Sequence, residues 1–145
     1  MPRFLCALLC AAIVAVVPVF AWATPASGVS GTVLGKGTSI ETIKVKNDGP
    51  TDIVVHHIVI EPGGSTGWHY HPGELIAVVH KGTLTRTLHD CSVHTNPAGQ
   101  SFVELAGQKD VHVGRNLGTE SVELYVTYAI PAGAPLSIDA VDPGC

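Results

Sequence analysis

The sequence predicts an all-β domain of antiparallel sandwich or barrel type. Short segments that alternate apolar and polar residues follow one another, and turn signals separate them every ~8–12 residues. No amphipathic helical period is found after residue 24, and neither an internal repeat nor a low-complexity tract is present. The chain has 145 residues, enough for one domain with a buried core.

Four strands are predicted in the first half of the domain. They are Ser39–Lys46, Asp52–Glu61, His69–His80 and Thr83–Leu88. The first and last alternate in polarity, as half-buried antiparallel strands do, and the second is rich in β-branched residues. Asn47–Pro50 and Lys81–Gly82 supply turns.

Three further strands are predicted in the second half. They are Ser101–Leu105, Asp110–Arg115 and Ser121–Ile130. Asp90–Gly99 is predicted to be a polar loop, and Asn116 is predicted to bind a turn backbone through its side chain. Prolines and glycines from Pro131 onward indicate an extended tail, residues 132–145.

The N-terminal segment predicts export. Arg3 precedes an apolar run that ends in Ala21-Trp22-Ala23, a small-x-small cleavage site, so residues 1–23 read as a secretory signal peptide. The protein is then expected outside the cytoplasm, secreted or periplasmic, with no membrane attachment after cleavage. An uncleaved single-span anchor is the alternative. Residues 24–38 are rich in Gly, Ser and Ala and are predicted to be a flexible lead-in.

Cleavage also changes the cysteine count, because it leaves only Cys91 and Cys145. An even pair in an exported chain reads as one disulfide, which would fasten the tail to the loop after Thr83–Leu88. The alternative is that Cys91 and His94, spaced C-x-x-H, bind a metal.

Charge excludes some partners. The formal net charge is −4 and becomes −5 without Arg3, and the remaining basic residues do not cluster. Neither a nucleic acid nor an anionic membrane surface is therefore an expected partner.

The motif with the clearest chemistry is His69-Tyr70-His71, which follows a glycine-rich loop. Alternate residues of a strand point to the same face, so the two imidazoles are predicted to converge. His112 lies in a second alternating segment and is a third candidate. Converging neutral imidazoles suit a divalent transition metal.

These segments resemble the two motifs of the cupins. Gly63, His69-Tyr70-His71, an acid soon after and Gly82 are similar to the first motif. The second motif is similar to Gly99, Ala106-Gly107, His112 and Asn116. The resemblance covers about residues 50–130. It implies an antiparallel jelly-roll barrel, or double-stranded β-helix, over residues 39–131. It also implies that His69, His71 and His112 bind Fe, Mn, Ni, Cu or Zn.

The sequence departs from the cupin pattern at the acid of the first motif. The family usually leaves three or four residues between the second His and the Glu, whereas only Pro72 and Gly73 precede Glu74 here. The family also leaves six residues between this Glu and the glycine that ends the motif. Counting back six residues from Gly82 puts Leu75 where the acid belongs. One residue of slip moves a side chain to the other face, so Glu74 is a ligand only if a bulge at Pro72-Gly73 turns it inward.

Two functions from different classes remain open. The resemblance implies an exported metal-dependent enzyme, a dioxygenase or isomerase, that acts on a small molecule. The alternative is a non-catalytic module that binds a small ligand or a metal, because the fold itself does not decide. A homodimer through sheet edges is a further expectation from the resemblance.

Overall fold

The computed structural model describes residues 33–145 except residues 41 and 47. The predicted signal peptide, residues 1–23, lies outside the described residues. Residues 24–32 of the predicted lead-in lie outside them as well. The described chain is built from β-strands and one short 3₁₀ turn, η1 (Gln108–Asp110). Among the described residues, no helix has the length and apolar composition needed to cross a membrane.

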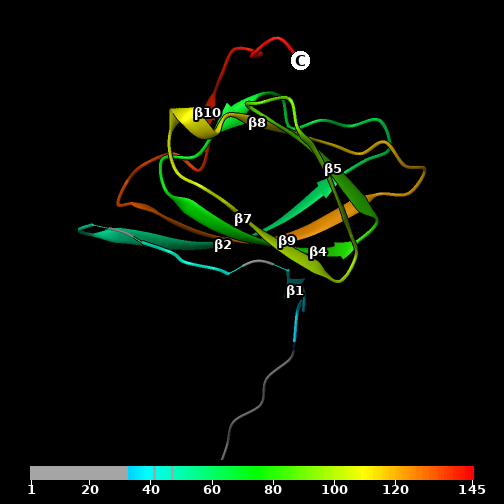
Figure 1. Cartoon of the computed structure of the whole chain (residues 1–145). Helices are drawn as coiled ribbons and strands as arrows, with labels where there is room; N and C mark the ends of the chain where they lie inside the picture. Colours follow the sequence, from blue (N-terminus) through cyan, green and yellow to red (C-terminus); the bar gives the residue numbers. More distant parts are fainter. Residues whose placement is uncertain (1–32, 41, 47) are drawn as a thin grey trace, which may run out of the picture. The chain divides into compact units, whose positions relative to one another are not determined.

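The strands form two five-stranded sheets, which lie as two layers in Figure 1. The first sheet has the order β1 (Thr38–Ser39), β7 (Gln100–Glu104), β4 (Glu74–Lys81), β9 (Val122–Pro131) and β2 (Thr51–Ile60). The second has the order β10 (Ile138–Asp139), β3 (His69–Tyr70), β8 (His112–Arg115), β5 (Thr83–Leu88) and β6 (Val93–Pro97). All these neighbours are antiparallel except β1 and β7. The all-β, antiparallel jelly-roll prediction is confirmed.

The core lies between the two layers and follows from the alternation of side chains. On β4, Leu75, Ala77 and Val79 are at most 2% exposed, while the residues between them face the other side of the sheet. Apolar residues of β9 and Leu84 of β5 pack against them, with Phe102 of β7. Burial of this shared face is the main stabilising contribution to the fold.

The predicted strand His69–His80 is in fact two strands in different sheets. β3 belongs to the second sheet and β4 to the first, and the chain crosses between them at Pro72-Gly73. Proline lacks the N–H that a continuing ladder needs. Gly73 passes so close to β9 that an added Cβ would lie 2.6 Å from Ile130 Cα. The crossing places His69 and His71 on one layer and Leu75 on the other.

Three other segments differ from the predictions made from the sequence. Among the described residues of the predicted strand Ser39–Lys46, only Ser39 belongs to a strand, and Ile43 and Val45 remain exposed, because alternation alone does not supply a partner strand. The predicted loop Asp90–Gly99 contains β6, which pairs with β5. The predicted extended tail contains β10, which pairs with β3.

The tail is held at two points, by the disulfide at Cys145 and by the pairing of β10 with β3. Cys91 and Cys145 form a disulfide across 54 residues of sequence, as predicted. Before this point the tail crosses β3, where the Ala140 N–H donates a hydrogen bond to the Trp68 carbonyl oxygen. The disulfide therefore fixes a segment that lies directly beside the two histidines of the first motif.

Candidate metal centre

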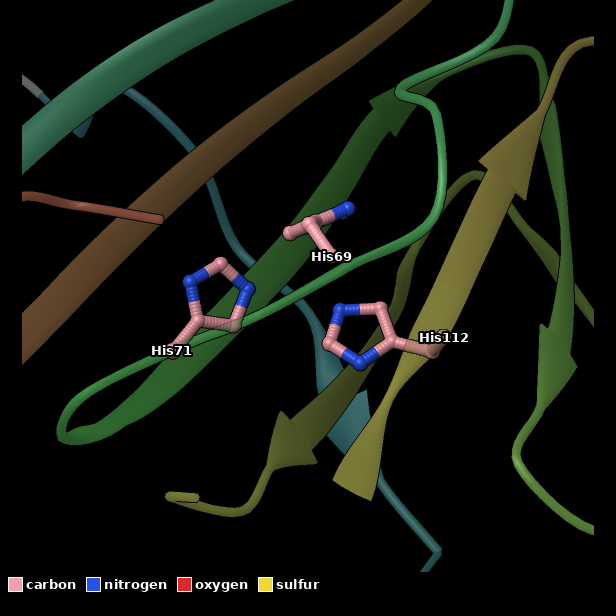
Figure 2. A group of neighbouring side chains, drawn as sticks. All are labelled: His69, His71 and His112. Atoms are coloured by element: carbon pink, nitrogen blue, oxygen red, sulfur yellow. The ribbon is translucent and has the colours of Figure 1, made fainter. Parts of the chain in front are cut away.

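Three histidines lie together at one end of the second sheet. His69 on β3 is directly opposite His112 on β8, and His71 follows β3 immediately. Figure 2 shows the three side chains pointing toward a common region. Their ring centroids are 4.5–5.2 Å apart, and one ring nitrogen from each lies within 4.8 Å of the others. The predicted convergence of the three rings is therefore present.

Backbone carbonyl groups hold each of the three rings through Nδ1. His69 Nδ1 lies 2.9 Å from the Gly67 oxygen, His71 Nδ1 lies 2.7 Å from the Leu136 oxygen, and His112 Nδ1 lies 2.7 Å from the Asp110 oxygen. A carbonyl oxygen can only accept, so each Nδ1 carries the hydrogen and donates. In the neutral rings, all three Nε2 atoms are then left with lone pairs. This arrangement of outer partners is typical of histidines that bind a metal.

A half-buried carboxylate, Glu104, that was not predicted from the sequence completes the cluster. Glu104 Oε2 lies 3.2 Å from His71 Nε2 and 3.1 Å from His112 Nε2. Its other oxygen, Oε1, lies 3.6 Å from the guanidinium of Arg86, which is itself buried. The one sequence signal for Glu104 was its position two residues after Phe102, which places both side chains on the same face of a predicted strand. That signal does not reveal which residues the acid faces.

The cluster is electrostatically coupled. Burial alone would raise the pKa of Glu104, but His112, His71 and Arg86 hold it well below its usual range. Burial opposes protonation of His112, yet the Glu104 carboxylate outweighs this effect and raises the pKa of His112. Burial and the neighbouring imidazoles lower the pKa of His69. Glu104 is thus ionised, and His69 favours the neutral form that a metal requires.

One atom of this cluster shows that it fits a cation. His112 Nε2 is buried and makes no hydrogen bond, although Glu104 Oε2 is 3.1 Å away. A buried polar atom without a partner costs about 1–3 kcal/mol. A cation held by the ring nitrogens would remove this cost. Three imidazole nitrogens beside a carboxylate are a donor set suited to Zn, Fe, Mn, Ni or Cu.

Glu74, the further ligand considered in the sequence analysis, lies outside the cluster. It sits on the face of β4 opposite to the buried Leu75, and its Oε2 accepts a hydrogen bond from the Lys46 N–H. No bulge at Pro72-Gly73 turns it inward, because the register of β4 with β9 is regular from Glu74 to Val79. Leu75 takes the inward position instead and lines the interior beside His69 and His71.

The comparisons agree with this fold. The cupin domain family matches residues 56–128, which is half of the chain and includes all three histidines. The chain belongs to the cupin family. No curated protein matches it.

Solved structures support the same fold. This cupin is similar to a conserved protein with a double-stranded β-helix domain from Klebsiella pneumoniae, with 24% identity and a TM-score of 0.51; the match covers 62% of this chain and 76% of that chain. It is also similar to the polyketide cyclase RemF from Streptomyces resistomycificus, with 18% identity, a TM-score of 0.52 and coverage of 66% and 67%. The DMSP lyase DddQ from Ruegeria pomeroyi matches with 14% identity, a TM-score of 0.54 and coverage of 61% and 43%.

Two cavities of the cupin meet at the cluster. A small one, about 50 Å³, is lined by all three histidines, Tyr128 and apolar core residues. A larger one, about 420 Å³, is lined by Arg86 as well. Phe102, Glu104 and His112 line both cavities. Small-molecule sites usually measure about 300–1,000 Å³, and the larger cavity falls in this range.

Proposed function

We propose that this cupin is an exported metal-dependent enzyme that binds a divalent transition metal through His69, His71 and His112. The observation that carries the proposal is the bonding of the three rings: each Nδ1 donates to a carbonyl oxygen, so in the neutral rings the three Nε2 lone pairs remain for one cation, with Glu104 Oε2 3.2 Å from the Nε2 of His71. The buried, unbonded Nε2 of His112 supports the same assignment.

Catalysis on a small molecule is supported by the larger cavity, because His112 and Glu104 lie in its wall. A bound metal in such a site would polarise a substrate oxygen, as an isomerase requires, or, if it is redox-active, would activate O₂, as a dioxygenase requires. The residues of the chain would contribute in other ways. Lys44 and Arg86 line the cavity together with the acids Glu104 and Asp110, so its wall offers charged groups of both signs to a polar substrate, and Phe102 supplies an apolar wall.

Export is supported by the disulfide between Cys91 and Cys145, since such bonds persist in oxidising compartments. It agrees with the signal sequence predicted for residues 1–23.

The metal site is tested by the bound-metal content of the purified protein. The His69→Ala/His71→Ala double variant is expected to lose the metal that the wild-type protein retains. His56→Ala/His80→Ala is the matched control, because both histidines are exposed and lie outside the cluster. Full metal content in the His69→Ala/His71→Ala variant would refute the site.

Catalysis is tested separately on metal-loaded protein. We expect turnover of small carboxylates or hydroxy-ketones, followed by oxygen consumption for a dioxygenase and by product isomer ratios for an isomerase. Tight metal or ligand binding without any turnover would favour the non-catalytic binding module instead.

A further inference from the structure

We propose that Glu104 is the carboxylate ligand of this metal site, and that it takes the place of the first-motif acid that Leu75 displaces. The inference rests on the proposed metal binding by the three histidines. It adds a fourth donor from β7, a strand that contributes no ligand to the sequence motif.

The sheet register explains how the acid can move to another strand. Leu75 on β4 is directly opposite Glu104 on β7. Residues paired in this way share a face of the sheet, with Cβ atoms about 4.5–5.5 Å apart. A carboxylate lost at position 75 can therefore be replaced from position 104 without leaving the same region of the barrel interior.

The distances at Glu104 match those between two ligands of one cation. Its Oε2 lies 3.2 Å from His71 Nε2 and 3.1 Å from His112 Nε2. Two donor atoms that each lie about 2.1 Å from a metal are separated by ~3.0–3.4 Å at the usual bond angles. A carboxylate oxygen and the Nε2 of a neutral imidazole are both acceptors, so their lone pairs repel unless a cation or proton lies between them.

Arg86 determines which oxygen of Glu104 is presented. Its Nη1 lies 3.6 Å from Oε1, whereas Oε2 is the oxygen in contact with His71 and His112. Arg86 is itself held in place, because its Nε donates a hydrogen bond to Asn96 Oδ1 and its guanidinium lies 3.6 Å from the centre of the Phe102 ring. Arg86 is therefore a positioning residue for Glu104 Oε2.

A carboxylate in the donor set has a consequence for metal choice. Carboxylate oxygen suits Mn²⁺, whereas a set of imidazoles alone suits Zn²⁺ and Cu²⁺ better. If Glu104 binds the metal, its removal must weaken Mn²⁺ binding more than Zn²⁺ binding. A purely structural effect would weaken both metals alike.

The experiment measures the Kd of Mn²⁺ and of Zn²⁺ for the purified full chain by competition with a chelator. Glu104→Gln is expected to weaken Mn²⁺ binding more than about tenfold, since losing even an outer partner of a ligand costs about 10–100-fold. Zn²⁺ binding is expected to fall less, so the ratio of the two Kd values changes. Glu74→Gln, whose carboxylate faces away from the site, is the matched control and should leave the ratio unchanged.

Two further variants keep the test decisive. Glu104→Gln leaves Arg86 buried beside a neutral group and can prevent folding. In that case Arg86→Gln is compared with Arg86→Gln/Glu104→Gln, which differ only in the carboxylate. The exchange Leu75→Glu/Glu104→Leu returns the acid to β4 and is expected to restore Mn²⁺ binding.

The proposal requires both the change in ratio and the recovery by the exchange variant. An unchanged ratio overturns it, and so does a folded exchange variant that fails to regain Mn²⁺ affinity. Either result would leave the three-histidine site intact. A wild-type protein that binds none of Zn, Fe, Mn, Ni or Cu would instead contradict the proposed function.

Discussion

His71 and Leu136 are 65 residues apart in sequence, yet the Nδ1–H of His71 donates a 2.7 Å hydrogen bond to the Leu136 carbonyl oxygen. The same tail pairs with β3 through Ile138 and Asp139, so it contacts the backbone of His69 as well. β3 has only two residues and meets β8 at a single pair. The C-terminal tail is thus a main support of two of the three histidines.

The first prediction concerns the disulfide that anchors this tail. Cys91→Ser/Cys145→Ser is expected to lower the free energy of unfolding by about 4 kcal/mol, the value that the chain-entropy model gives for a loop of this length. The affinity for the metal is also expected to fall, by about tenfold, because His71 loses a well-held partner for Nδ1. Denaturant unfolding and chelator competition measure the two effects.

Reduction of the wild-type protein provides the control for this prediction. Dithiothreitol should reproduce both effects in the wild-type protein and should change neither quantity in the double variant. An equal midpoint of unfolding for oxidised and reduced protein would contradict a stabilising role of the bond. Unchanged metal affinity would show that β10 holds the tail without the disulfide.

Asn116 gives the second prediction. The side chain is 1% exposed, its Nδ2 donates to the carbonyl oxygens of Ile60 and Glu120, and its Oδ1 accepts from the Gly118 N–H. The predicted turn-binding role is confirmed. Asn116→Ala leaves three backbone groups without this partner, so we expect a loss of at least about 2 kcal/mol of unfolding free energy.

Metal affinity separates this structural role from a role at the metal. The folded Asn116→Ala protein should bind the metal as the wild-type protein does, because Asn116 does not belong to the histidine cluster. Weaker metal binding at temperatures well below the unfolding midpoint would count against this interpretation.

The part of the fold that the sequence predicts is the part set by local alternation. Leu75, Ala77 and Val79 are buried on β4 because every second residue is apolar, and His69 and His71 share a face for the same reason. The turn at Gly82 is equally local, since its φ of 71° suits glycine. These features need no knowledge of which strands are neighbours.

The parts that could not be predicted depend on pairing between distant segments. Glu104 reaches the histidines only because β7 and β4 align it with Leu75, a register that neither strand specifies alone. Ser39–Lys46 alternates as a strand should, but of its described residues only Ser39 joins a strand. Likewise, the carbonyl of Leu136 is indistinguishable in sequence from any other, and its role depends on the path of the tail.

The third prediction concerns alkaline pH and Tyr128. This tyrosine lies in the core between Leu75 and β2, and its ring centroid is 5.6 Å from that of His71. Burial, together with the nearby negative charge of Glu104, raises the pKa of Tyr128 to about 12. The phenol therefore holds its proton more tightly in the folded chain than in the unfolded chain, where its pKa is about 10.

The sign of the effect on stability follows from this difference. The contribution of Tyr128 is fully present below pH 10 and is lost as the pH rises through the folded pKa of about 12. The metal-free wild-type protein should lose stability between these values more steeply than Tyr128→Phe, which has no phenol to ionise. Denaturant unfolding of both proteins at a series of alkaline pH values measures the difference. Parallel curves for the two proteins would mean that Tyr128 ionises as freely as an exposed tyrosine and that its environment is wetter than the packing around it implies.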